Sequence, residues 1–357
     1  MPKLQFKELE NKEQIIQRIE RGRRSKWWRR LGAPGRGFRY VDAAGGRISD
    51  QTSLERIKSL VIPPAWRLVR ISPAASSRIQ AVGVDTTGRI QYLYHPQFAA
   101  RQQKKKFEKI ERFGTFLPQL RKATNEHLAL DGFPREKVLA LMIRLINQLY
   151  IRMGGEKSAS TYKTYGITTL QNRHLEIGRS GKLVFEFVGK SHVKHRKVLV
   201  DEELASIMKQ LKDLGTSRKL FHYHDAEGKP RPVKPSEVNQ YIKEITCDEF
   251  SAKDFRTWGA TLLAAVELAD IGCCDDDRIR KSNVVKAIKK VAEQLGNTVA
   301  VCRSSYVHPT VLNDYEKGII LEHFRPKKGR RTKRREEDYE PEEYSLLKLF
   351  EAFRNGK

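Results

Sequence analysis

Hydrophobic and polar residues alternate with a period of two between positions 38 and 95, which is typical of half-buried strands. The paired glycines at 45 and 46 predict a hairpin in the first part of this stretch, FRYVDAAGGRI. A short helix, LERIKSL, is expected next, and it ends at IPPAW because proline cannot continue a helix. Three more strands are predicted, with a turn at Asp85–Gly88 between the last two: RLVRI, SRIQAVGV and RIQYLYH.

The hydrophobic spacing becomes mostly helical from about residue 113 to residue 320. The most apolar helix is expected directly after Pro134, in EKVLALMIRLINQLYIR. Two strands, ITTLQNRHLEIG and KLVFEFVGK, are expected to form a β-hairpin joined at Arg179–Gly181. Further helices are predicted over 201–213, 236–247, 253–269 and 283–295. No internal repeat is visible.

Both ends of the chain differ from these two regions. The first 35 residues contain a short amphipathic stretch and then a basic segment with two tryptophans. Eight basic residues lie between Arg325 and Arg335, and an acidic stretch and a candidate amphipathic helix follow them. We therefore predict an α+β protein in four parts: a basic N-terminal extension (1–35), a small β-rich domain (36–100), a larger mainly α-helical domain with a β-hairpin (101–322) and a C-terminal tail (323–357).

The charge balance points to a polyanionic partner. Lys and Arg number 69 against 43 Asp and Glu, a formal net charge of +26. Such a cation attracts nucleic acid and binds its phosphates by releasing counterions. No apolar run is long enough to span a bilayer, and the N-terminus lacks the apolar core of a signal peptide. The four cysteines form no CxxC pair, so neither a zinc site nor a disulfide framework is indicated, and we expect a reduced, cytoplasmic protein.

Signatures of common nucleotide and metal enzymes are missing: there is no GxxxxGK[ST], HExxH or GxSxG. We therefore expect no nucleotide and no metal cofactor. Four segments instead offer groups suited to attack on a phosphodiester: YIRMGGE, FVGKSHVKH, KDFRTWGAT and LGNTVAVCRSSYVHP. Arginine forks match the non-bridging phosphate oxygens, a lysine can protonate a leaving oxygen, and a phenol can act as nucleophile. The residues concerned are Arg152, Lys190, Arg256, Asn297 and Tyr306. Each alone also fits an ordinary structural role, so the prediction depends on their conjunction and order.

This set resembles the catalytic domain of type IB DNA topoisomerases of the compact poxviral and bacterial kind. YIRMG is similar to that family's first-arginine motif, and the strand ending in FVGK is similar to its lysine-bearing hairpin. KDFRTWG resembles its second-arginine helix, and LGNT…SSYVHP resembles its nucleophile segment, with Asn297 nine positions before Tyr306. The stretches FRYVDAAGGRI, IPPAW and GRIQYLYHP resemble its N-terminal β-module.

The resemblance implies a role for each residue. Tyr306 would bond covalently to a DNA 3′-phosphate, Arg152 and Arg256 would clamp the non-bridging oxygens, and Asn297 would donate a hydrogen bond to one of them. Lys190 would protonate the departing 5′-hydroxyl with help from Arg152. Four further positions match residues that touch DNA or stand beside the second arginine: Gln91, Tyr92, Tyr94 and Lys253. The partner would be double-stranded DNA of the nucleoid, bound by a monomer.

Two positions depart from the family pattern. Poxviral members carry histidine where Asn297 stands, and asparagine cannot act there as an acid or base. Ser158 stands where some members have an aromatic DNA contact, which puts their tight sequence preference in doubt. The ending YVHP favours the bacterial branch.

Two alternatives stay open at this stage. A tyrosine recombinase shares the catalytic fold, although that class usually has histidine where Lys253 stands and a helical N-terminal domain. A non-catalytic architectural DNA-binding protein would also account for the charge.

Overall fold

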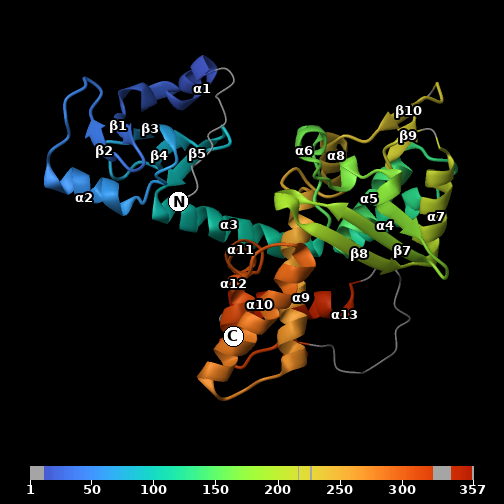
Figure 1. Ribbon diagram of the computed structural model, residues 1–357. Helices are drawn as coiled ribbons and strands as arrows, with labels where there is room; N and C mark the ends of the chain where they lie inside the picture. The colour runs from blue at the N-terminus through green and yellow to red at the C-terminus, as the bar shows by residue number, and fades with distance from the viewer. Residues whose placement is uncertain (1–11, 216, 226, 325–338, 356–357) are drawn as a thin grey trace. The chain divides into compact units, whose positions relative to one another are not determined.

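The computed structural model describes residues 12–215, 217–225, 227–324 and 339–355. The chain divides into two compact units, Met1–Lys106 and Phe107–Lys357, and the division falls inside helix α3 (Pro96–Thr115). Figure 1 shows a β-rich first unit and a mainly helical second unit, so the predicted α+β class is confirmed. No helix in the described part of the chain is both long and apolar enough to cross a membrane.

The first unit is built on one five-stranded antiparallel sheet in the order β2-β1-β3-β4-β5. Its elements are α1 (Lys12–Ile19), η1 (Gly22–Lys26), β1 (Trp28–Ala33), β2 (Gly37–Val41), α2 (Gln51–Ser59), β3 (Arg67–Ile71), β4 (Ile79–Val84) and β5 (Ile90–Tyr94). Ile57 of α2 packs with Ala81, and Ile19 of α1 packs with Val82 and Val84. Because neighbouring strand residues face opposite ways, the two helices cover opposite faces of the sheet.

Strand β1 lies within residues 1–35, which the sequence analysis assigned to an extension. It forms a hairpin with β2, and the glycines at 45 and 46 support only an isolated bridge between Val41 and Arg47. The basic residues of β1 weaken its hydrophobic alternation, so the strand was not predicted. One of them, Arg30, has a structural role. The Arg30 guanidinium donates to the carbonyl oxygens of Pro63 at 3.1 Å and Trp66 at 2.7 Å. The segment therefore contributes a strand to the sheet.

The second unit surrounds α5, whose residues are buried along almost its whole length. Its α-helices are α4 (Leu117–Leu128), α5 (Arg135–Leu149), α6 (Glu156–Tyr162), α7 (Glu202–Asp213), α8 (Pro235–Ile245), α9 (Ala252–Ile271), α10 (Asp277–Leu295), α11 (Val299–Ser305), α12 (Pro309–Glu316) and α13 (Pro341–Arg354). Short 3₁₀ turns are η2 (Ile167–Thr169), η3 (Asn172–His174), η4 (Lys190–His192) and η5 (Leu321–Phe324). The predicted helices over 201–213, 236–247 and 253–269 are confirmed, and α10 begins earlier than the predicted 283, capped by the Asp276 carboxylate.

A small sheet in the second unit has the order β6-β7-β8, formed by β6 (Leu175–Ile177), β7 (Lys182–Val188) and β8 (Lys194–Val200). A separate two-stranded ribbon joins β9 (His222–His224) and β10 (Pro230–Pro232). The predicted hairpin exists, but its first strand is shorter than expected because 3₁₀ turns occupy 167–174. Strand β8 was not predicted; its residues alternate between half-buried and exposed and include three Lys or Arg side chains and one histidine.

The candidate amphipathic helix near the C-terminus is confirmed as α13. It buries Leu346, Leu349 and Phe350 in the main core, and its Glu343 forms an ion pair with Arg121 at 2.7 Å. The end of the predicted tail is therefore part of the second unit. The basic run 325–335 and residues 1–11 lie outside the described residues.

Candidate active site

Arg152 follows the C-terminal end of α5, where Tyr150 takes a left-handed conformation (φ 55°) and turns the chain. Its backbone oxygen accepts a hydrogen bond from the Ile167 amide at 2.8 Å. Its guanidinium donates to the Asn297 side-chain oxygen and, at 3.4 Å, to the Gly296 carbonyl. The structure thus joins two of the predicted site residues directly.

Arg256 lies on α9 and is only 4% exposed. Its guanidinium donates to the carbonyl of Tyr150 and, at 2.9 Å, to that of Leu295, while its Nε is buried and has no hydrogen-bond partner in the described part of the chain. The pKa of Arg256 is lowered to about 10, mainly by burial and next by the positive charge of Arg152. Among the described residues, no carboxylate forms an ion pair with either arginine. Two neighbouring cations held without an acid form a site suited to an anion.

Tyr306 directly follows helix α11 and packs beside Arg256. The Arg256 guanidinium carbon lies 5.4 Å from the centre of the Tyr306 ring. Thr261, one turn further along α9 than Arg256, has its hydroxyl 3.2 Å from the Tyr306 carbonyl and accepts the His308 amide at 3.1 Å. Helix α9 therefore positions both the second arginine and the phenol.

Asn297 follows α10, which ends at Gly296 in a left-handed conformation (φ 61°). The backbone amide of Asn297 donates to the Ala292 carbonyl at 3.0 Å, and the side-chain oxygen of Asn297 accepts a hydrogen bond from Arg152. Its side-chain nitrogen is buried and has no partner among the described residues. That nitrogen is held next to the guanidinium of Arg152 and faces the thiol of Cys302, and this contact opposes the rise that burial causes in the pKa of Cys302.

Lys190 lies in the turn η4 between β7 and β8, and its side chain is exposed. The turn is closed by the Gly189 amide, which donates to the Val193 carbonyl at 2.8 Å. Lys190 shares one cavity with both arginines; the cavity is lined by Tyr150, Ile151, Arg152, Tyr165, Phe187, Gly189, Lys190, His195, Lys197 and Arg256. All five predicted catalytic residues are therefore brought together, through this cavity and the contacts of Asn297 and Tyr306.

Two lining residues, His195 and Lys197, were not predicted. Lys197 donates to the Gln294 carbonyl, and its pKa is lowered to about 8 by burial and by Arg256 and Arg152. The pKa of His195 is lowered to about 4 by burial, followed by Lys197, Arg152 and Arg256. Alternation in the sequence could not have found them, because β8 consists of four polar residues followed by three apolar ones. Their position five and seven residues after Lys190 is the only signal that the sequence offers.

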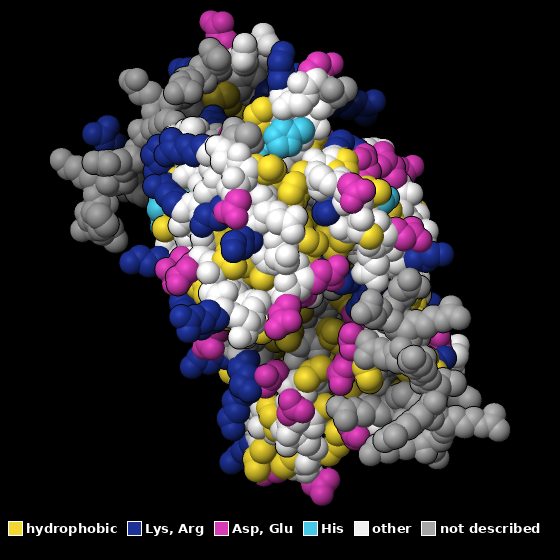
Figure 2. All heavy atoms as spheres, turned by 90° about the vertical axis from the view of Figure 1, so that its right-hand side faces the viewer, with side chains coloured by type: hydrophobic (Ala, Val, Ile, Leu, Met, Phe, Trp, Pro, Cys, Tyr) yellow, Lys and Arg dark blue, Asp and Glu magenta, His cyan; other side chains and the backbone are white. Residues whose placement is uncertain are grey.

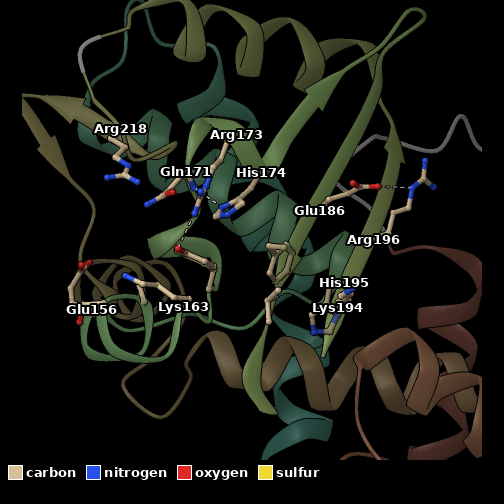
Figure 3. A pocket seen from close by; sticks show the side chains of 15 residues that line it. Glu156, Lys163, Gln171, Arg173, His174, Glu186, Lys194, His195, Arg196 and Arg218 are labelled. Atoms are coloured by element: carbon tan, nitrogen blue, oxygen red, sulfur yellow. Dashed lines mark hydrogen bonds and ion pairs between the residues drawn. The ribbon is translucent and has the colours of Figure 1, made fainter. Parts of the chain in front are cut away.

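A larger recess of about 1050 Å³ adjoins the catalytic cavity and shares Tyr165, Phe187 and His195 with it. Figure 3 shows side chains from α6, η3, β7 and β8 around this recess. Its lining includes five cations and two carboxylates: Lys163, Arg173, Lys194, Arg196, Arg218, Glu156 and Glu186. On the face shown in Figure 2, by contrast, acidic side chains are interspersed among the basic ones. Positive charge is thus in excess directly beside the catalytic cavity.

The other predicted DNA contacts lie on different elements. Tyr92 and Tyr94 share one face of β5 with their ring centres 6.2 Å apart, and Tyr94 is 46% exposed. Gln91 alternates to the other face and donates to Asp85 at 2.9 Å. Lys253 is exposed in the first turn of α9 and does not line the cavity. In the described part of the chain, no group of three or more His, Cys, Asp or Glu side chains is arranged to hold a metal ion.

Comparison with known proteins decides the family. The model described as "Eukaryotic DNA topoisomerase I, catalytic core" matches residues 95–330, and "Bacterial DNA topoisomerase IB, N-terminal domain" matches residues 37–85. The DNA topoisomerase 1B of Acanthamoeba polyphaga mimivirus is 33% identical over 279 residues, covering 76% of this chain and 82% of the viral protein.

The chain belongs to the type IB DNA topoisomerases. The DNA topoisomerase 1B of vaccinia virus (strain Copenhagen) is 24% identical over 67% of this chain and 73% of its own length. The DNA topoisomerase 1 of Mycosarcoma maydis is 28% identical over 46% of this chain but only 18% of its own length. The compact viral proteins thus share most of their length with this topoisomerase, whereas the fungal protein shares a part. The family resemblance predicted from the sequence is confirmed.

Proposed function

We propose that this topoisomerase relaxes supercoiled double-stranded DNA by cutting one strand with Tyr306, letting the free end rotate, and resealing the strand. The observation that carries the proposal is the pair of guanidiniums of Arg152 and Arg256, which have no carboxylate partner among the described residues. The phenol of Tyr306 lies beside the second of them. A phosphodiester is the anion that such a pocket would stabilise during attack by a phenol.

In the proposed reaction, the phenolic oxygen of Tyr306 bonds to the scissile phosphorus while the bond from phosphorus to the 5′ oxygen breaks. The phenol proton passes to solvent, and Lys190 gives a proton to the departing 5′ oxygen, with help from Arg152. Resealing is the reverse, in which the 5′-hydroxyl attacks and the tyrosine leaves. Because the phosphotyrosyl bond conserves the energy of the phosphodiester, the cycle needs no nucleotide.

Charge stabilisation would come from the chain itself. Arg152 and Arg256 would hold the two non-bridging oxygens, on which negative charge grows during attack. The unpaired side-chain nitrogen of Asn297 would donate to one of them. Further DNA contacts would come from Lys253 and from three residues of β5: Gln91, Tyr92 and Tyr94.

We further propose a cytoplasmic monomer of the bacterial branch that acts on nucleoid DNA without a metal or nucleotide. The match of residues 37–85 to a bacterial N-terminal domain supports the branch. The proposed domain roles are DNA binding by residues 36–100 and catalysis by residues 101–322.

The test is plasmid relaxation in EDTA without ATP, with Tyr306→Phe as the matched variant. The wild type should relax the plasmid and leave a covalent protein–DNA adduct after denaturation, whereas Tyr306→Phe should bind DNA without cutting it. Relaxation by Tyr306→Phe would overturn the assignment of the nucleophile. A wild type that forms no adduct would favour an architectural protein. A plasmid without any recombination target distinguishes relaxation from recombinase activity.

A further inference from the structure

His195 on β8 occupies a slot between two glycines from distant parts of the chain. A Cβ atom added to Gly189 would lie 2.6 Å from the imidazole Cδ2 and Nε2, and one added to Gly296 would lie 2.2 Å from Cε1. The ring also stacks on Phe187, with the ring centres 5.1 Å apart. The imidazole therefore fills the space between the two glycine backbones and leaves no room for a side chain on either.

Each of these glycines directly precedes a predicted catalytic residue. Gly189 begins the turn that carries Lys190, and its amide closes that turn on Val193. Gly296 ends α10 and precedes Asn297. Moving the ring would move the Lys190 turn relative to the Asn297 turn.

The imidazole acts through its shape. Within the described residues it forms no hydrogen bond or ion pair, although it lines the catalytic cavity. The charged groups that lower its pKa to about 4 come from three elements: Lys197 of its own strand, Arg152 after α5, and Arg256 of α9. The ring is consequently neutral at physiological pH and adds no charge to a pocket that already holds several cations.

We infer that His195 is a positioning residue, a spacer that fixes the distance between the Lys190 turn and the Asn297 turn. The inference rests on the proposed function, because it assigns His195 a role through the proposed general acid and the proposed amide donor. It extends that function to a residue that was not predicted from the sequence.

The first test compares His195→Ala with His195→Phe in single-turnover cleavage and DNA binding. The alanine variant should cleave about 100-fold more slowly at unchanged DNA affinity, the scale of loss expected from a misplacement of about 1 Å. Phenylalanine refills the slot and should restore most of the rate. His224→Ala, a histidine change on β9 outside the cavity, is the matched control and should cleave normally.

A substrate with a better leaving group distinguishes a positioning role of His195 from a general loss of structure in the variant. A substrate with a 5′-bridging sulfur does not need a proton from Lys190, so it should recover much of the rate lost in His195→Ala. Gly189→Ala should be slow because its methyl group would overlap the ring, and adding His195→Ala should not multiply that loss. Gly178→Ala is the control, since its Cβ would meet Lys182 only at an ordinary 3.5 Å.

The inference is overturned if His195→Phe is as slow as His195→Ala, if sulfur gives no recovery, or if the losses at 189 and 195 multiply. It is also overturned if His195→Ala is folded and as fast as the wild type. If His195→Ala does not fold, His195→Phe and Gly189→Ala decide the question. A wild type without a covalent adduct would instead refute the proposed function, so the two failures are distinguishable.

Discussion

Thr261 connects the helix that carries Arg256 to the chain at and directly after the proposed nucleophile, and Thr261→Val tests this connection. The hydroxyl is fully buried and lies 2.8 Å from the Thr257 carbonyl and 3.2 Å from the Tyr306 carbonyl. It also accepts the His308 amide at 3.1 Å. Valine keeps the shape of the side chain but removes the hydroxyl, which is the acceptor of the His308 amide among the described residues.

The expected loss follows from the buried His308 amide. An amide left without an acceptor costs about 1–3 kcal/mol of unfolding free energy, whereas the contact with Thr257 is a weak bond within one helix. For a domain of this size, each kcal/mol lowers the melting temperature by about 2–4 °C, so Tm should fall by roughly 2–12 °C. Displacing the Tyr306 segment by about 1 Å should slow cleavage by about 100-fold at unchanged DNA affinity.

The assays are thermal unfolding and single-turnover formation of the covalent adduct. Ser345→Ala is the matched control, since this buried hydroxyl of α13 donates only to the Pro341 carbonyl one turn before it, at 2.7 Å. It should lose little stability and no cleavage rate. A Thr261→Val variant with the Tm and cleavage rate of the wild type would refute the connection.

Three further predictions concern the catalytic cavity. Arg256→Lys should slow cleavage by about 10²–10³-fold, because an ammonium lacks the planar fork whose separate nitrogens hold the Tyr150 and Leu295 carbonyls; a normal single-turnover rate would contradict this. Lys190→Ala should be slow on ordinary DNA but recover on a 5′-bridging sulfur substrate, and a lack of recovery argues against a general acid. The pKa of His195 is about 4 in the folded chain, whereas its ordinary value is 6.5. As the pH falls between these values, the unfolded chain binds a proton at this residue before the folded chain does, so the free energy of unfolding decreases. Urea unfolding of His195→Phe should show a smaller loss over that range, and an equal loss would remove His195 as its source.

The residues proposed as catalytic could be named from the sequence because they lie in short motifs at fixed spacing. The helices followed from their apolar periodicity, most clearly in α5 and α9. Two strands were missed for one physical reason. Both β1 and β8 are rich in basic residues, so hydrophobic alternation is weak in them, and their long side chains hold backbone carbonyls elsewhere in the fold.

The residues missed at the site depend on tertiary contacts. Nothing in the local sequence of His195 shows that Gly189 and Gly296 approach it from two sides. Similarly, Thr261 looks like an ordinary helix residue until Tyr306 and His308 are placed against it. Motifs identify groups that touch the substrate, whereas the residues that position those groups become visible only in the fold.

The way in which the cations are held explains how one pocket can be both stable and reactive. Arg256 is held by carbonyls at the C-terminal ends of α5 and α10, through Tyr150 and Leu295. Lys197 is held by the Gln294 carbonyl at the end of α10, and Arg152 donates to Gly296 at the same place.

A helix C-terminus carries only about half a negative charge, so it orients a cation without neutralising it. A carboxylate in the same position would hold the arginines more tightly but would cancel the charge that a phosphate needs and would repel the phosphate itself. The positive charge of these cations therefore stays uncompensated. This charge lowers the stability of the fold, and the same charge attracts DNA. It follows that a carboxylate placed beside Arg152 or Arg256 would slow DNA cleavage even if it formed an ion pair with them.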